Sequence, residues 1–284
     1  MASMRDIKRR KTSVQSTGQI TKAMKLVSTA KLQKAKIKAE ETRPFFRKIY
    51  ATISSIIKTS GNIKHPLLHE REGNRHTYIV ITSNRGLAGG YNGNVCKLIY
   101  GKEKNINQNV IIIAAGKKGS DILKKKGFEI LSEHHNAVDV PTYVDALNIG
   151  DEVLNLYKEN KTDKVYIAFT GFNSSISQEA KIMRLLPLEA GNFEEEIVEE
   201  PMNYEPDAEE VLDQIIPKYI NSIIYGALKE SVASEHGARM TAMDSATNNA
   251  NDMIDKLALQ YNRARQASIT QELSEIVGGA EALK

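Results

Sequence analysis

The sequence predicts an α/β fold combined with a long α-helical coiled coil, in which the N- and C-terminal helices pair antiparallel beside a central Rossmann-like domain. Apolar or small residues recur at three-and-four spacing at both ends of the 284-residue chain. Between the ends, apolar runs typical of buried strands alternate with helical stretches. We therefore expect a coiled-coil helix at 1–60, a central α/β domain with an acidic connection at 61–207, and a second coiled-coil helix at 208–284.

The first helix is expected to begin at Ser3, because Ser3 and Asp6 form a capping-box pattern, and to end near Lys58. Its weak points are Pro44 and the stop signal at 60–62. The residues predicted for its pairing face are Ile7, Val14, Thr21, Met24, Ala35, Thr42, Phe45, Ile49, Ile53 and Ile56.

The middle of the chain is expected to form a compact, largely parallel sheet covered by helices. The buried strands are expected at 78–82, 110–114 and 165–169, and a further strand at 178–188. The helices are expected at 94–100, 120–126 and 144–158. The acidic stretch that follows is expected to be a loop or a mobile connection.

The last segment contains no proline from Lys218 onward and predicts a second long helix, with Gly237 as a bending point. Its seam is rich in Ala and Ser and poor in Leu, so we infer that it pairs with the first helix and that another protein sheathes part of the pair. The predicted seam residues are Ile220, Ile223, Ala227, Ala246, Ala250, Met253, Leu257, Tyr261, Ala264, Ser268, Leu273, Ile276 and Ala280.

Charge is segregated along the chain although the net charge is only +4. Residues 1–48 carry 14 Lys and Arg against three acidic residues, whereas residues 189–213 carry eleven acidic residues and no Lys or Arg. Such asymmetry indicates partners with patterned charge. The basic helix leaves three readings open: a nucleic-acid-binding coiled coil, a surface for an acidic protein, and a solvated face.

Motifs for catalysis are weak in this sequence. The Gly-rich loop at 82–92 follows a strand but matches neither dinucleotide nor P-loop spacing, so a tight turn is the favoured interpretation over nucleotide binding. His134 and His135 with Asp139 suit a solvated loop better than a metal site, and Cys96 suits a small buried residue. We expect no catalytic residue, cofactor or metal, and a nucleotide-dependent enzyme is the weaker alternative.

Three segments carry a family resemblance: 19–27 (QITKAMKLV), 234–243 (SEHGARMTAM) and 261–280 (YNRARQASITQELSEIVGGA). They resemble the gamma-subunit family of F-type ATP synthases, and the order of helix, α/β domain and helix agrees over essentially the whole chain. The chain departs from the family pattern at Lys11, Gly18 and Gly237, where apolar, helix-favouring and alanine residues are usual.

The resemblance implies a rotor that couples ion-driven rotation of the c-ring to ATP synthesis or hydrolysis, with the nucleotide chemistry left to the beta subunits. The implied partners are three alpha and three beta subunits of the catalytic head, the epsilon subunit and the c-ring, with membrane contact only through the c-ring. The implied location is the cytoplasmic face of a bacterial plasma membrane, as a peripheral subunit.

The resemblance also implies contact residues, carried over from matching motif positions. Those implied to meet the catalytic head are Met24, Lys25, Arg239, Gln266, Thr270 and Glu272. Those implied to meet the c-ring are Tyr204 and Glu205.

Overall fold

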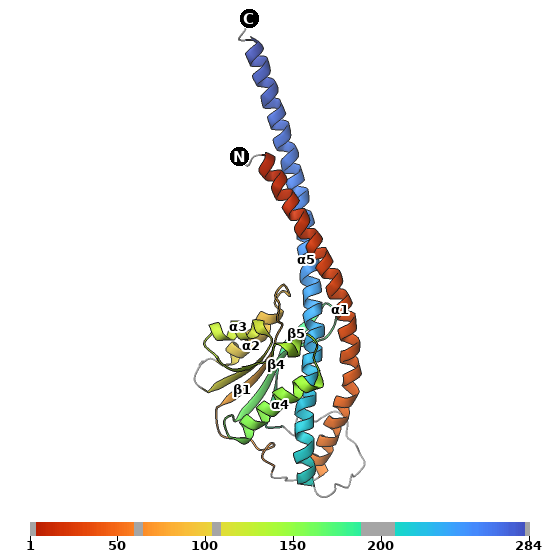
Figure 1. The fold of residues 1–284 in the computed structure, drawn as a ribbon, viewed down its shortest axis with the longest axis vertical. Coiled ribbons are helices and arrows are strands. Elements are labelled where there is room, and N and C mark those ends of the chain that lie inside the picture. Colours follow the sequence, from red (N-terminus) through yellow and green to blue (C-terminus); the bar gives the residue numbers. More distant parts are fainter. Residues whose placement is uncertain (1–3, 60–64, 104–108, 189–207, 282–284) are drawn as a thin grey trace. The chain divides into compact units, whose positions relative to one another are not determined.

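The computed structural model describes residues 4–59, 65–103, 109–188 and 208–281, and the chain forms two compact units. Met1–Ser28 and Met240–Lys284 make up the first, called here the helical-pair unit. Thr29–Arg239 make up the second, called here the α/β unit. Two long helices, α1 (Met4–Thr59) and α5 (Ala208–Glu281), each contribute to both units (Figure 1).

The prediction of one long helix at the start of the chain is confirmed by α1, which continues through Pro44. The predicted residues Ile53 and Ile56 are fully buried in the core of the α/β unit. That burial stabilises the end of the helix, because each buried Ile contributes about 2 kcal/mol relative to exposure. The side chains of Thr42 and Phe45, predicted for the same face, lie outside the described set.

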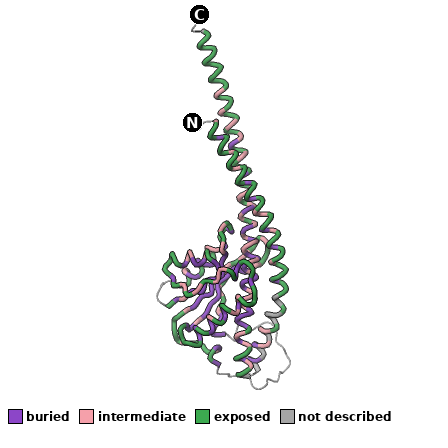
Figure 2. The backbone as a smooth tube through the Cα atoms, in the orientation of Figure 1, coloured by how far each residue is buried: buried purple, intermediate pink, exposed green. Residues whose placement is uncertain are grey.

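A five-stranded sheet forms the centre of the α/β unit, with the strand order β3-β2-β1-β4-β5. The strands β1 (His76–Ile81), β2 (Val110–Ala115), β3 (Glu129–Glu133) and β4 (Lys164–Phe172) are parallel, and β5 (Gln178–Leu186) pairs antiparallel with β4. The largely parallel sheet is therefore confirmed. Figure 2 shows that its central strands are buried, as expected for a sheet covered on both faces.

Alternate side chains of β1 enter two separate apolar clusters, because successive residues of a strand point to opposite faces. Tyr78 and Val80 join a cluster with α2 (Tyr91–Lys102) and α3 (Lys117–Lys125). Ile79 and Ile81 join a larger cluster with α4 (Tyr143–Lys158) and α5. A short 3-10 turn, η1 (Asn136–Val138), leads toward α4, whose first turn is capped by Thr142 and Asp145.

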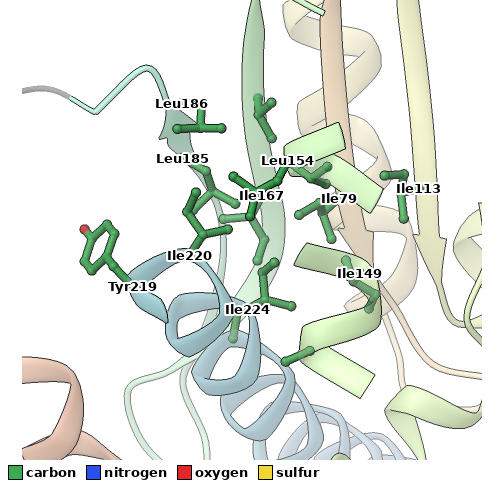
Figure 3. Close-up of a cluster of buried hydrophobic side chains, with 14 of the residues drawn as sticks. Ile79, Ile113, Ile149, Leu154, Ile167, Leu185, Leu186, Tyr219, Ile220 and Ile224 are labelled. Atoms are coloured by element: carbon green, nitrogen blue, oxygen red, sulfur yellow. The ribbon is translucent and has the colours of Figure 1, made fainter. Parts of the chain in front are cut away.

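The apolar stripe of α5 is the part of the chain that joins this helix to the sheet. Ile220 and Ile224 point toward Ile167 of β4 and toward α4 (Figure 3). All three side chains are fully buried. Seven buried apolar residues from Leu212 to Leu228 thus recur at helical spacing, and their burial sets which face of α5 meets the sheet.

The last helix, α5, begins at Ala208 and contains Pro217, which comes just before the proline-free stretch that starts at Lys218. The last acidic residues of 189–213 therefore lie in a helix. Leu212 and Ile216 are fully buried in the core, and this packing outweighs the hydrogen bond that Pro217 cannot donate. Glu209 and Glu210 lie in the first turn, where negative charge is favourable.

Strand β3 was not predicted at all. Its five residues alternate between exposed and half-buried side chains, and three of the five are polar. A short, half-polar edge strand carries little sequence signal, and only its pairing with β2 identifies it.

Gly237, predicted as a bending point, lies within a continuous stretch of α5. A Cβ atom at this position would lie 2.9 Å from Nε2 of Gln178 and 3.3 Å from the Ser175 carbonyl oxygen. Because Gly237 has no side chain, the turn between β4 and β5 can pack close to the backbone of α5. Close approach, and not bending, is the geometry that this position serves.

Gly150 of α4 provides a test of the contact between α4 and α5. A Cβ atom there would lie 1.8 Å from Oδ1 of the buried Asn221 of α5. We expect Gly150→Ala to lower the free energy of unfolding by about 1–3 kcal/mol, measured by urea denaturation of the purified chain.

Gly93→Ala is the matched control, because Gly93 lies in α2 and a Cβ atom there meets nothing within 4 Å. This substitution should stabilise by about 0.5–1 kcal/mol through helix propensity. Equal stability of the Gly150→Ala and Gly93→Ala variants would contradict the close contact.

Candidate functional site

The helical-pair unit is held together by an antiparallel seam between α1 and α5. A Cβ atom at Gly18 would lie 3.3 Å from the Cβ of Ala250, and Thr21 Oγ1 lies 2.8 Å from Thr247 Oγ1. Further along α1, Lys25 Nζ lies 2.6 Å from Asp244 Oδ1. Numbers rise along one helix as they fall along the other, so the predicted antiparallel pairing is confirmed.

Small residues make this close pairing possible. Gly18, which departs from the family pattern, is buried in the seam opposite Ala250. Ile7, Val14, Thr21 and Ser28 of α1 recur at seven-residue spacing; Val14 is half-buried and the other three are buried, as is Gly18 between Val14 and Thr21. A larger side chain at Gly18 would force the helices apart at this level, because the Ala250 methyl group already lies in contact distance.

Hydroxyl groups satisfy each other across the same seam. Thr21 Oγ1 lies 3.0 Å from the Gly18 carbonyl oxygen, and Thr247 donates to the Met243 carbonyl oxygen at 2.7 Å. These bonds allow polar side chains to be buried in the seam at low cost. The pairing is therefore polar as well as apolar, as the poverty in Leu predicted.

The sequence-predicted residues Met24 and Lys25 lie in this part of α1, and both are half-buried. Lys25 forms the ion pair with Asp244, although 39% of its side chain and 47% of that of Asp244 are exposed. A pair this exposed contributes about 0–1 kcal/mol. Lys25 is thus part of the helical pair and still presents charge to solvent.

The register of the seam also shows where pairing ends. The contacts that place Gly18 opposite Ala250 place Met4, the first described residue of α1, level with Ala264 of α5. Within the described residues, α5 continues beyond this level without α1, and Figure 2 shows this end as exposed. The prediction that Leu273, Ile276 and Ala280 continue the paired seam is wrong, because α1 does not extend that far.

This unaccompanied end of α5 carries three of the predicted contact residues, Gln266, Thr270 and Glu272, all of them exposed. Thr270 donates to the Gln266 carbonyl oxygen at 2.9 Å, and Ser268 donates to Glu272 at 3.3 Å, both within the helix. Large apolar side chains are exposed on the same stretch: Ile269, Leu273, Ile276 and Val277 are between 48% and 68% exposed. Such a row marks an interaction surface.

The predicted contact residue Arg239 lies in a different setting, inside the α/β unit. Its guanidinium lies 2.7 Å from Glu235 Oε1, and 10% of its side chain is exposed. It also donates to the Gly86 carbonyl oxygen in the Gly-rich loop at 3.3 Å. Burial raises the pKa of Glu235, and the neighbouring Arg239 opposes that rise.

The Gly-rich loop uses its polar side chains to close on itself and on neighbouring loops. Asn92 Oδ1 accepts from the Ser83 backbone N–H at 2.8 Å, and Ser83 Oγ donates to the Arg85 carbonyl oxygen at 2.6 Å. Asn84 accepts from the Lys117 backbone N–H and donates to the His135 carbonyl oxygen. These bonds account for the loop as a tight strand-to-helix turn, the favoured interpretation.

The remaining predicted positions give no site. Tyr204 and Glu205 lie outside the described residues. In the part of the chain that the structure describes, no group of three or more His, Cys, Asp or Glu side chains is arranged to hold a metal ion. No described helix combines the length and the apolar character that crossing a membrane requires.

Three partners of predicted or seam residues were not found from the sequence: Asp244, Thr247 and Glu235. Glu235 lies one turn before Arg239 on the same helix. The other two lie far from their partners along the chain, and the bond between Lys25 and Asp244 spans 219 positions. Aligning the two heptad patterns antiparallel at Gly18 and Ala250 would have brought Lys25 close to Asp244. The sequence therefore contained the signal for this ion pair, but reading it required the register in which α1 and α5 pair.

Comparison with known sequences gives a consistent result. A family model described as ATP synthase matches residues 3–283. The chain is 53% identical over 291 residues to the ATP synthase gamma chain of Lachnoclostridium phytofermentans, with 100% of both chains covered. It is 45% identical to the sodium-ion-specific ATP synthase gamma chain of Acetobacterium woodii, covering 99% of this chain and 98% of the relative.

Solved structures share the fold. A chain from the central stalk and c-ring structure of Tetrahymena thermophila mitochondrial ATP synthase is 25% identical, with a TM-score of 0.61, and the match covers 80% of this chain and 99% of the other. A chain from the Euglena gracilis mitochondrial ATP synthase structure is 19% identical, with a TM-score of 0.68, covering 99% and 94%. The second likeness shows the fold alone.

His236, beside Arg239 on α5, makes the stability of the α/β unit sensitive to pH. Burial, with positive charge from Arg239 and Lys31, lowers its pKa from the ordinary 6.5 to about 4, although Asp139 opposes the shift. The folded chain thus keeps His236 neutral where the unfolded chain protonates it. We expect stability to fall as the pH is lowered from 6.5 toward 4.

His236→Gln should flatten this part of the pH profile, measured as the free energy of unfolding at pH steps between 7.5 and about 4.5. The exposed His69→Gln serves as the control and should leave the slope unchanged. Parallel slopes for wild type and His236→Gln would contradict a neutral, buried His236.

Proposed function

This chain belongs to the ATP synthase gamma-chain family, and we propose that it is the central-stalk rotor subunit of an F-type ATP synthase. In this role it couples ion-driven rotation of the c-ring to ATP synthesis or hydrolysis in the alpha/beta catalytic head. The subunit itself performs no chemistry. Nucleotide turnover belongs to the head, and this chain supplies the mechanical connection.

The observation that carries the proposal is the end of α5, which continues past its partner helix with exposed apolar side chains. A helix with Ile269, Leu273, Ile276 and Val277 in water is unfavourable unless another protein covers it. A ring of subunits around this end supplies such a cover. These apolar side chains form no hydrogen bonds or ion pairs with such a cover, so the end of α5 can turn inside the ring.

Rotation affects the head only if the shaft touches each beta subunit differently. A ligand or partner shifts a conformational equilibrium only through differential contact with its states. The paired helices meet this requirement, because two different helices side by side have no threefold symmetry about the shaft axis. Each orientation of the shaft therefore offers the three beta subunits unequal surfaces.

We propose three alpha and three beta subunits, the epsilon subunit and the c-ring as partners, at the cytoplasmic face of a bacterial plasma membrane. The excess of Lys and Arg in residues 1–48 favours acidic segments of the head as the surface that α1 meets. The nucleic-acid-binding alternative receives no support from the family match.

We propose Met24, Lys25, Gln266, Thr270 and Glu272 as contacts with the head. Exposure of the last three and the partial exposure of Lys25 support this assignment. We also propose Arg239 as a head contact. Its guanidinium already binds Glu235 and the Gly86 carbonyl oxygen, so the head would share the group with these two partners. Tyr204 and Glu205 remain proposed contacts with the c-ring.

The proposed function is tested by recovering the tagged chain from its native membranes and identifying the bound proteins by mass spectrometry. We expect about three copies each of two larger nucleotide-binding chains per copy of this chain, together with the c-ring protein. Recovery of the chain alone, or with nucleic acid that added salt removes, would overturn the rotor proposal.

Lys25 allows the head contact to be separated from the internal ion pair. We expect Lys25→Glu to lower ATP-driven ion pumping per ATP hydrolysed by about twofold or more, because reversed charge faces the head. Assembly should be retained, since the ion pair with Asp244 is partly exposed and weak.

The charge-swapped double variant, Lys25→Glu with Asp244→Lys, restores the internal pair but not the charge presented to the head. If coupling depends on the head contact, the double variant should remain impaired. Full recovery of pumping would instead assign the effect to the pair inside this chain.

A further inference from the structure

Two buried side chains bind α5 to the loops of the α/β unit through main-chain carbonyl groups. Lys229 of α5 donates from Nζ to the Pro141 carbonyl oxygen at 2.7 Å, in the loop that precedes α4. Tyr91, the first residue of α2, donates from its hydroxyl to the Ser231 carbonyl oxygen of α5 at 3.1 Å. The donor is on α5 in one bond and on α2 in the other, and the two bonds attach within three residues of α5.

Lys229 is unusual for a lysine because only 9% of it is exposed. Its ammonium group lies 4.9 Å from the centre of the Tyr225 ring, one turn earlier on α5, and that ring packs edge-on against Tyr143 of α4. Burying a lysine is costly unless its charge is compensated. The carbonyl oxygen and the ring face supply that compensation, and both hold the side chain in one direction.

Tyr91 is equally enclosed, with 4% of its surface exposed. Burial raises the pKa of its hydroxyl well above the ordinary value, so the group remains a hydrogen-bond donor. The Ser231 carbonyl that accepts this bond belongs to the interior of α5. Tyr91 therefore binds the backbone of α5 and not a side chain, which could change its rotamer.

Between residues 227 and 234 the buried side chains other than Lys229 are Leu228 and the small residues Ala227, Ser231, Ala233 and Ser234. Two longer polar contacts lie nearby on α5: Glu230 lies 3.6 Å from Lys181 of β5, and Arg239 donates to the Gly86 carbonyl oxygen at 3.3 Å. Within the described residues, the hydroxyls of Ser231 and Ser234 find no hydrogen-bond partner. Apolar contact is non-directional, whereas hydrogen bonds weaken steeply when their geometry is distorted. Resistance to turning here comes from directional bonds.

We propose that Lys229 and Tyr91 are positioning residues that set the rotational angle of α5 on the α/β unit. Twisting the helix about its axis stretches both bonds at once, because one attaches to the start of α2 and the other to the loop before α4. The apolar stripe from Leu212 to Leu228 anchors the helix, and these two bonds determine its angle. This inference rests on the proposed rotor function, in which the angle of the helix decides which surface the head receives.

The test uses the assembled ATP synthase in liposomes, carrying this chain with Lys229→Met and Tyr91→Phe, singly and together. Both substitutions keep most of the buried volume and remove the donor. Spin labels on cysteines introduced at the exposed Lys125 of α3 and Lys218 of α5 report the distance distribution between these two helices within the α/β unit. The second readout is ATP-driven ion pumping per ATP hydrolysed.

For the double variant we expect the distance distribution to widen and pumping per ATP to fall about twofold, with smaller effects of the single variants. Lys229→Arg should restore both readouts, because it retains a buried cation with a donor. The matched control combines Lys97→Met and Tyr100→Phe, which remove the same groups from other faces of α2 and should change neither readout.

The inference is overturned if the double variant shows an unchanged distance distribution, or a wider distribution with unchanged pumping per ATP. If Lys229→Met prevents assembly, Tyr91→Phe alone decides the matter by the same two readouts. Failure of the proposed function is distinguishable, because it would appear as the absence of coupled pumping with the unsubstituted chain.

Discussion

The contact of α5 with the sheet is the interaction on which the rest of the structure depends. Ile220 and Ile224 pack against β4 and α4, and neighbouring turns of α5 continue the same buried stripe. This burial, at about 2 kcal/mol for each large side chain, lets a helix of 74 residues begin in the core of a domain and then leave it. That anchor fixes which face of α5 meets the sheet.

The character of the helix changes once it leaves the core. Large apolar residues give way to Ala, Ser and Thr, and hydrogen bonds from Tyr91, Arg239 and Thr21 replace part of the apolar contact. Small residues let helices approach closely but bury little area, so directional bonds carry more of the specificity. The composition suits a shaft whose surface must also satisfy a surrounding protein.

Exposed features then take on a functional meaning that a globular domain would not give them. The apolar row at the end of α5 is costly to leave in water, and the basic surface of α1 favours an acidic partner. The proposed assembly gives both surfaces a partner. The same membership leaves the Gly-rich loop as a structural turn tied to Asn92, Asn84 and Arg239.

The sequence by itself determined the two long helices, the strands β1, β2, β4 and β5 and the antiparallel pairing, because helical and strand periodicities are local and strong. It also carried the family resemblance through the motifs near Met24, Arg239 and Gln266. The division of the chain into segments 1–60, 61–207 and 208–284 stays a prediction. Weak local signals failed where the pattern was short and half-polar, as in β3.

Only the tertiary structure decided the register of the seam, the level at which α1 ends beside α5, and the partners of Lys25 and Arg239. These depend on contacts between residues more than a hundred positions apart or on which turn of a helix faces a loop. Gly237 shows the reason in one residue. The sequence shows only the missing side chain, whereas the structure shows Gln178 and Ser175 packed where that side chain would be.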